Sequence, residues 1–310
     1  ARPKTAPKVT SDGAATFFEV TPAHIGALSD TDLRELVARL CMARLAVAGH
    51  PPEYVIWGGD QRAADGGIDV RVQMPAEVAV TAGFPRARIG LQVKAMRMPE
   101  SEIQKEMCPG GMLRTSIGDL VRAHGAYIIA SSETTADKPY QDRVSAMKSA
   151  AATEEGADNA EFDFYDARRL TNWTNQHPGI VAWVRSRLGN PLQGWRPYGQ
   201  WANTRGAKSQ PFLEDDTPRL IDPTDPERKH SLVDGLQYVR SLLRAGGSSV
   251  RIAGLSGVGK TRFVQALFEE SAAQNALVPE LAVYTDTADA PVPPPLALLD
   301  ELLANGRRAV

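Results

Sequence analysis

The chain has 310 residues, of which 43% are hydrophobic and 23% charged, and its formal net charge at pH 7 is −2. This composition is typical of soluble globular proteins and excludes a disordered, collagen-like or low-complexity polymer. Because one domain takes roughly 100 to 200 residues, the length predicts two structural units. The near-neutral total gives no global positive field for nucleic acid, although a local basic cleft is compatible with it.

The sequence predicts a cytoplasmic protein that does not enter a membrane. No apolar run approaches the ~20 residues of a membrane-spanning helix, and the first residues, ARPKTAPKVTSDG, lack the apolar stretch of a signal peptide. The two cysteines, Cys41 and Cys108, are not part of a CxxC pair. This excludes a disulfide framework and a cysteine-built zinc site, so both are expected to be buried or inert thiols.

The first unit is expected over residues 16–189, after an N-terminal extension, residues 1–15. Apolar residues at three- and four-residue steps predict its first helix over Thr31–Ala48. After a glycine-rich turn, strands are expected at Ile68–Met74 and Arg88–Met96. The elements that follow are helices at Glu100–Met107, Ser116–His124, Asp142–Thr153, Ala167–Asn175 and Gly179–Leu188, and strands at Ala126–Ser131 and Phe162–Tyr165. This order predicts an α/β fold with a mixed sheet flanked by helices.

Residues 190–230 are rich in Pro, Gly and Asp and predict an ordered linker. Three aromatic residues in it, Trp195, Tyr198 and Trp201, are expected to pack on a domain surface more often than to stack on bases. A second α/β unit is expected over residues 231–310. Its predicted elements are helices at Ser231–Leu243 and Ala297–Asn305 and strands at Ser249–Ala253 and Leu281–Thr285, with a further strand starting at Arg308.

A phosphate-binding loop is predicted at the start of the second unit. Residues 254–261 read GLSGVGKT, the G-x-x-x-x-G-K-[ST] pattern, between the apolar run SVRIA and the helical stretch RFVQALFEE. The glycines, which include Gly254, Gly257 and Gly259, allow backbone N–H groups to curl around phosphate oxygens at a helix N-terminus. Lys260 is expected to reach the β- and γ-phosphates of ATP, and Thr261 to bind the accompanying Mg²⁺. The acidic residue that usually completes such a magnesium site is expected beyond residue 310, so the chain is predicted to be a fragment that hydrolyses nucleotide poorly.

Four residues of the first unit carry candidate phosphodiester chemistry: Glu35, Asp69, Gln92 and Lys94. Side chains two apart on a strand point to the same face, so Gln92 and Lys94 project together, and Asp69 lies on the preceding strand. Phosphodiester cleavage needs a hard divalent ion on oxygen ligands and a cation near the attacking water. The fallback acids are Asp60 and Asp65 for Asp69, and Glu19 and Glu53 for Glu35.

Each candidate also has a purely structural interpretation. Asp69 can be a hairpin residue, Glu35 part of a solvated helix face, Lys94 a charge at a strand edge and Gln92 a satisfied core amide. Against this, polar side chains on an otherwise apolar strand need partners or a task. Basic residues near these positions can follow a phosphate backbone or form an ordinary solvated face; they are Arg62, Arg71, Arg86, Arg88, Lys94, Arg97 and Lys105.

An Asp on one strand and Q-x-K on the next resemble the Mrr-like branch of the PD-(D/E)xK superfamily, which has the restriction-endonuclease-like fold. The resemblance covers approximately Thr16 to Gly189. It implies that Asp69, Gln92 and Glu35 hold Mg²⁺ or Mn²⁺ and that Lys94 orients or polarises the attacking water. Gln92 offers only a neutral oxygen, so the predicted site holds its metal less tightly than an all-carboxylate site.

The fusion of such a nuclease to a P-loop NTPase resembles the prokaryotic antiviral STAND (Avs-type) proteins. The resemblance implies a Mg²⁺-dependent endonuclease that cuts double-stranded DNA after nucleotide-driven oligomerisation, triggered when a C-terminal sensor absent from this chain binds a phage protein. The P-loop alone leaves the choice between STAND and AAA+ open. Two alternatives also remain open, a catalytically silent nucleic-acid-binding or assembly module and a subunit of an ATP-driven restriction enzyme.

Overall fold

The structure is a computed structural model, and it describes residues 18–58, 66–199, 217–222, 225–245, 249–269 and 276–306. The N-terminal extension, the fallback acids Asp60 and Asp65, Arg62, Trp201 and the strand expected from Arg308 lie outside these residues.

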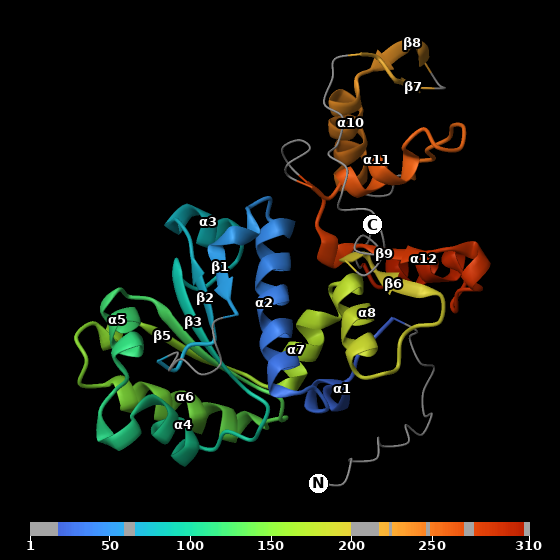
Figure 1. The fold of residues 1–310 in the computed structure, drawn as a ribbon. Coiled ribbons are helices and arrows are strands. Elements are labelled where there is room, and N and C mark those ends of the chain that lie inside the picture. Colours follow the sequence, from blue (N-terminus) through green and yellow to red (C-terminus); the bar gives the residue numbers. More distant parts are fainter. Residues whose placement is uncertain are drawn as a thin grey trace.

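A five-stranded mixed sheet organises the first unit (Figure 1). Its strands lie in sequence order: β1 (Val55–Trp57), β2 (Val70–Gln73), β3 (Arg88–Lys94), β4 (Ala126–Ser131) and β5 (Glu161–Tyr165). The first three strands pair antiparallel, whereas β4 is parallel to both β3 and β5. The expected α/β class with a mixed sheet is therefore confirmed. The sequence analysis missed β1, whose three residues are too few to show an alternating pattern.

Helices cover both faces of this sheet. One layer contains the helices before β1 and after β5, and the other contains the helices between β3 and β5 (Figure 1). The first layer consists of α1 (Pro22–Gly26), α2 (Asp30–Val47), α7 (Ala167–Thr174) and α8 (Pro178–Arg187), and the second of α4 (Glu100–Met107), α5 (Thr115–Arg122) and α6 (Asp137–Ala151). A short helix, α3 (Ala76–Thr81), connects β2 to β3, and single 3-10 turns lie at Pro52–Tyr54 (η1), Pro109–Gly111 (η2) and Ala157–Asn159 (η3).

Alternate residues of the strands supply two hydrophobic cores. Leu91 and Val93 of β3 pack with α2, α7 and α8, whereas Tyr127 and Ile129 of β4 pack with α4, α5 and α6. Burial on both faces explains why every residue of β4 is apolar or small, as is usual for strands covered by helices on both sides. On β3 this alternation places Gly90, Gln92 and Lys94 on the face that α4 and α5 cover.

The described residues after Gly189 form two small sheets of two strands each, and not one larger sheet. Strand β6 (Trp195–Pro197) pairs antiparallel with β9 (Val283–Thr285), and β7 (Leu220–Asp222) pairs with β8 (Asp225–His230). The helices of this part are α10 (Leu232–Ala245), α11 (Lys260–Ala266) and α12 (Pro295–Ala304), and 3-10 turns lie at Pro279–Leu281 (η6) and Thr287–Asp289 (η7). The strand predicted at Ser249–Ala253 is wrong, since these residues are irregular. A strand needs a hydrogen-bonded neighbour, and the described strands on either side in sequence, β8 and β9, pair with β7 and β6.

Two regions of this second part have different surroundings. Helices α10 and α11 pack on each other around a small core that includes Leu236, Phe263 and Leu267. By contrast, β6, β9 and α12 lie beside α8, and Trp195, Leu298 and Leu302 belong to the same core as α2 (Figure 1). No helix among the described residues is long and apolar enough to cross a membrane.

Candidate functional site

Asp69 lies one residue before β2, at the point where β2 and β3 separate. Its carboxylate is almost fully buried, with 2% of the side chain exposed. Oδ2 accepts a hydrogen bond of 2.7 Å from the Val93 N–H, and Oδ1 lies 3.0 Å from Arg34 Nε on α2. These contacts fix the carboxylate against the residue between Gln92 and Lys94.

A tight glycine turn holds Asp69 in this place. Gly67 has φ +83°, a backbone conformation that favours glycine, and a Cβ on it would lie 2.6 Å from Cδ of Arg114 and displace that side chain. Its carbonyl accepts a hydrogen bond of 3.1 Å from the Tyr127 hydroxyl, and the neighbouring Gly66 carbonyl accepts one from Ser116. The turn that leads into Asp69 is thereby tied to β4 and α5.

Gln92 and Lys94 project from β3 toward α4, as the sequence analysis predicted from their spacing. Gln92 is 4% exposed, and its Oε1 is buried without a hydrogen-bond partner. An unpaired buried acceptor costs about 1 to 3 kcal/mol, so the interpretation of Gln92 as a satisfied core amide does not fit. Lys94 is half-buried, and its Nζ lies 2.8 Å from Glu106 Oε2.

Glu106 lies on α4 and was not among the site residues predicted from the sequence. Arg114 also contacts it, with Nε 2.7 Å from the backbone carbonyl and Nη2 3.5 Å from Oε1. Glu106 and Asp69 also lie near the phenol of Tyr127. Burial raises the pKa of Tyr127, and the charges of these two carboxylates raise it further. The signal in the sequence was the helical spacing: Ile103 and Met107 form the buried stripe of α4 and place Glu106 beside it.

Asp30 and Arg34 extend this network to the first turns of α2. Arg34 Nη2 lies 2.7 Å from Asp30 Oδ2, and Asp30 Oδ1 accepts a hydrogen bond of 3.3 Å from the Ala95 N–H. Asp69 and Asp30 therefore cap the two backbone N–H groups that flank Lys94, and Arg34 bridges both carboxylates. It is Arg34, and not the adjacent Glu35, that reaches the end of β3.

Glu35 occupies the side of α2 that faces α8. Its Oε1 accepts hydrogen bonds of 2.9 and 2.7 Å from Arg39, and Oε2 lies 3.0 Å from Nη2 of Arg187. Both guanidinium groups stack on Trp183, with 5.1 and 5.2 Å from Cζ to the ring centroid. The structure thus brings together Asp69, Gln92 and Lys94, and it engages Glu35 in a different network. Its fallback Glu53 is exposed in η1.

The oxygen atoms near Asp69 fit a divalent cation in their chemistry. Carboxylate and amide oxygens are the ligands that Mg²⁺ and Mn²⁺ prefer, and the unpartnered Oε1 of Gln92 is a buried acceptor that a cation would satisfy. The described residues contain no metal-binding group of three His, Cys, Asp or Glu side chains, so an amide or water oxygen has to complete any site here.

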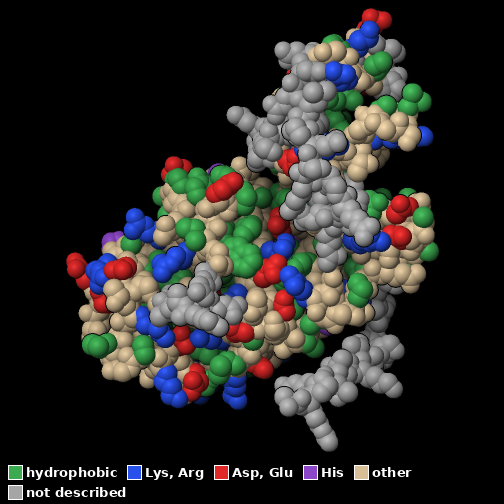
Figure 2. Space-filling view, in the orientation of Figure 1, with side chains coloured by type: hydrophobic (Ala, Val, Ile, Leu, Met, Phe, Trp, Pro, Cys, Tyr) green, Lys and Arg blue, Asp and Glu red, His purple; other side chains and the backbone are tan. Residues whose placement is uncertain are grey.

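Acidic partners offset several of the basic residues near the site. Lys94 pairs with Glu106, Lys105 with Glu102, and Arg86 with Glu161. On the face of the molecule seen in Figure 2, Lys and Arg side chains are interspersed with Asp and Glu. The local field is therefore mixed in sign, and an approaching phosphate backbone would have to compete with these carboxylates.

The P-loop sequence forms an exposed loop that leads into α11. Gly257 and Gly259 have positive φ angles of 81° and 91°, and Gly259 is the N-cap of the helix. Lys260 Nζ donates hydrogen bonds of 2.9 and 2.7 Å to the carbonyls of Gly254 and Leu255, and Thr261 is exposed. Lys260 thus links two carbonyls of the loop, and phosphate oxygens can replace these carbonyls as acceptors of its hydrogen bonds.

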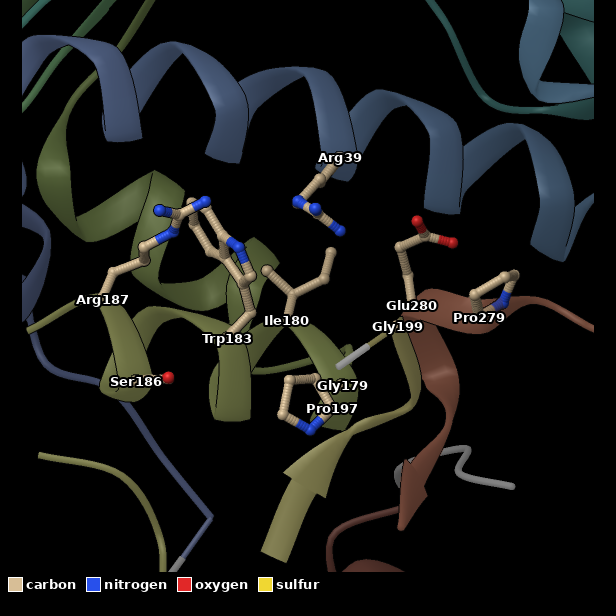
Figure 3. A pocket seen from close by; sticks show the side chains of 10 residues that line it. All are labelled: Arg39, Gly179, Ile180, Trp183, Ser186, Arg187, Pro197, Gly199, Pro279 and Glu280. Atoms are coloured by element: carbon tan, nitrogen blue, oxygen red, sulfur yellow. The ribbon is translucent and has the colours of Figure 1, made fainter. Parts of the chain in front are cut away.

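A cavity of about 630 Å³ lies where η6 meets α2 and α8 (Figure 3). Arg39, Trp183 and Arg187 line one side of it, and Glu280 lines the other. Burial raises the pKa of the Glu280 carboxyl, and its own backbone N–H and the charge of Arg39 oppose this shift. Arg39 pairs with Glu35, and Arg187 pairs with both Glu35 and Asp32, so each arginine of the cavity already has an acidic partner.

No protein-family model matches the chain, and neither the curated proteins nor the solved structures contain one that is detectably similar to it.

Proposed function

We propose that the first unit is a metal-dependent DNA endonuclease with a restriction-endonuclease-like fold. One observation carries this proposal: Asp69 accepts the Val93 N–H at 2.7 Å, which joins it to the two residues, Gln92 and Lys94, that project from the same strand. The proposed fold is supported by the order of helix α2, the antiparallel strands β1 to β3, helices α4 and α5 and then the parallel strand β4.

In this proposal Asp69 and Gln92 hold Mg²⁺ or Mn²⁺ at the end of β3. The bound ion supplies Lewis-acid polarisation of the phosphate and makes water more acidic. Asp69 is oriented by the Val93 N–H and Arg34, so its carboxylate is held in place before any ligand arrives. Lys94 is near enough to orient the attacking water or to balance the charge that develops on the phosphate. Because one such site cuts one strand, cleavage of duplex DNA requires two copies of the chain.

The P-loop adds a proposed regulatory role for ATP with Mg²⁺, bound through Gly254, Gly257, Gly259, Lys260 and Thr261. We propose that nucleotide binding promotes a homo-oligomer in which the nuclease units act together, and that a phage protein bound by a sensor elsewhere in the full protein starts this assembly. The P-loop sequence and the bridging position of Lys260 support this role.

The direct test is cleavage of supercoiled plasmid by the full chain with Mg²⁺ or Mn²⁺, with and without ATP. We expect metal-dependent nicking that Asp69→Ala and Lys94→Ala both abolish. Lys105→Ala is the matched control, since Lys105 is an exposed lysine that pairs with Glu102. Cleavage that persists in both folded variants would contradict the assignment of the site.

One observation favours a second candidate function, a catalytically silent nucleic-acid-binding or assembly module. The charged groups at the site already have partners, Asp69 with Arg34 and Lys94 with Glu106. A silent module predicts DNA binding without metal-dependent cleavage at any protein concentration, including concentrations at which the chain oligomerises.

A further inference from the structure

We infer that Glu106 provides the second carboxylate of the divalent-cation site. Without metal, this carboxylate forms an ion pair with Lys94. This inference rests on the proposed function, and it assigns to α4 the acidic ligand that the sequence analysis placed at Glu35.

The first support is the position of Glu106 over β3. Its Oε2 lies 2.8 Å from Lys94 Nζ, and Lys94 and Gln92 project from the same face of the strand. Glu106 is 17% exposed, so its carboxylate is mostly withdrawn from water. Helix α4 holds Glu106 in place, because Ile103 and Met107, which flank Glu106 in sequence, are fully buried.

An independent observation is the orphaned oxygen of Gln92. This side chain is 96% buried, faces the layer that contains α4, and leaves Oε1 without a partner. Such an acceptor needs a donor or a cation. Asp69 accepts the N–H of the next residue, Val93, and Glu106 pairs with Lys94 two positions along the same strand. Both carboxylates also lie near the Tyr127 side chain. Two carboxylates and one amide oxygen then give a donor set suited to Mg²⁺ or Mn²⁺.

The ion pair with Lys94 explains how Glu106 is accommodated without metal. Lys94 and Arg114 balance its charge in the structure. A divalent cation would replace the ammonium group as the partner of Glu106, and Lys94 would then be available to the water or phosphate. The same pair thus links metal occupancy to the position of the proposed catalytic lysine.

Calorimetric titration of the full chain with Mn²⁺, in the absence of nucleotide and DNA, tests the inference. Glu106→Gln is expected to weaken Mn²⁺ binding by about tenfold or more. Glu102→Gln is the matched control on the same helix, where Glu102 pairs with the exposed Lys105, and it should leave the affinity unchanged. Both titrations are run in a Thr261→Ala background, so that the P-loop contributes no binding.

Three results would overturn the inference, and they differ in what they leave standing. If Glu106→Gln lowers the melting temperature in EDTA but leaves the Mn²⁺ affinity unchanged, Glu106 is structural, and the proposed nuclease survives provided that Asp69→Asn weakens binding. If the unsubstituted chain binds no Mn²⁺, the inference and the proposed metal-dependent function both fail. Should Glu106→Gln not fold, it is combined with Lys94→Met, which removes both charges of the ion pair. Equal Mn²⁺ affinity in this double variant and in Lys94→Met alone would also exclude a ligand role.

Discussion

The buried oxygen of Gln92 is expected to lower the stability of the metal-free protein and to be needed for the proposed activity. Its Oε1 has no partner in the core between β3 and α4. Gln92→Met keeps a similar volume and removes the unpaired acceptor, so the metal-free protein is expected to gain about 1 kcal/mol in unfolding free energy. The same variant should lose metal-dependent cleavage. Urea unfolding in EDTA, together with the plasmid assay, measures both effects, and a loss of stability would show that the oxygen has a partner in the folded protein.

His177 makes the stability of the protein depend on pH. It is 5% exposed, neither ring nitrogen has a hydrogen-bond partner, and burial, followed by the charge of Arg44, lowers its pKa to about 4. The folded state therefore favours the neutral ring. Between about pH 6.5 and 4 the unfolded chain binds a proton that the folded chain does not, so stability decreases as the pH falls through this window.

Replacing His177 tests this dependence. The full pKa shift corresponds to about 3 kcal/mol, and His177→Gln should remove this part of the loss between pH 6.5 and 4. Unfolding free energies measured across that range give the comparison, with the exposed His124→Asn as the control. Equal pH slopes for the unsubstituted protein and His177→Gln would contradict the assignment.

At the scale of elements, Arg240 joins α10 to the end of the P-loop helix. This guanidinium is 1% exposed and donates to the carbonyls of Leu267, Ala266 and Glu269, with distances of 3.0, 2.7 and 2.8 Å. These carbonyls lie at and just after the C-terminal end of α11, where a helix leaves acceptors unpaired and favours positive charge. The small core around Leu236 and Phe263 depends on this connection.

Arg240→Met is therefore expected to destabilise α10 and α11 by about 3 kcal/mol, since it leaves buried acceptors unpaired. Hydrogen exchange over residues 260–268 should accelerate, and ATP binding should weaken because α11 begins at Lys260. Arg244→Met provides the control, because Arg244 is exposed and bonds the Ala276 carbonyl at the surface. Unchanged exchange in Arg240→Met would refute the role of this arginine.

The elements themselves differ in how far the sequence predicts them. The helix over Thr31–Ala48 was predictable because its apolar residues recur at three- and four-residue steps, and the strand at Ala126–Ser131 because it is a short continuous apolar run. The strand before the P-loop was not, since a strand depends on neighbours that the local sequence does not specify. The spacing of Gln92 and Lys94 was enough to predict that both project from the same face of the strand. Whether Arg34 or Glu35 reaches Asp69 depends on the rotation of α2 about its axis, which is set by its packing on the sheet and on α8.

At the scale of the whole molecule, Gly179 sets how closely the two parts of the chain approach. A Cβ on Gly179 would lie 2.5 Å from the Glu280 carbonyl oxygen and 2.8 Å from that of Ala282. Both are backbone atoms, so η6 would have to move away from α8. Alanine favours a helix over glycine by about 1 kcal/mol, but overpacking against the backbone costs about 1 to 3 kcal/mol, and the clash is expected to dominate.

Gly179→Ala should therefore loosen β9 and α12 while leaving the sheet of the first unit intact. Limited proteolysis within residues 277–304 is expected to become faster. The control is Gly199→Ala, because a Cβ at Gly199 meets nothing within 4 Å. If both variants resist proteolysis as the unsubstituted chain does, the close approach at Gly179 does not hold the two parts together.

The shared core around α8 also affects when the chain can fold during synthesis. Trp195 and Phe18 form a T-shaped aromatic pair, with ring centroids 5.8 Å apart. The Phe18 N–H donates a hydrogen bond to the Glu301 carboxylate, 283 positions away in sequence. Contacts this distant in sequence form late and slow folding. As the chain leaves the ribosome, the sheet and its two helix layers can assemble first, but the surface around Phe18 stays open until α12 has emerged. The first unit would therefore complete its packing only after residues 254–261 had been synthesised.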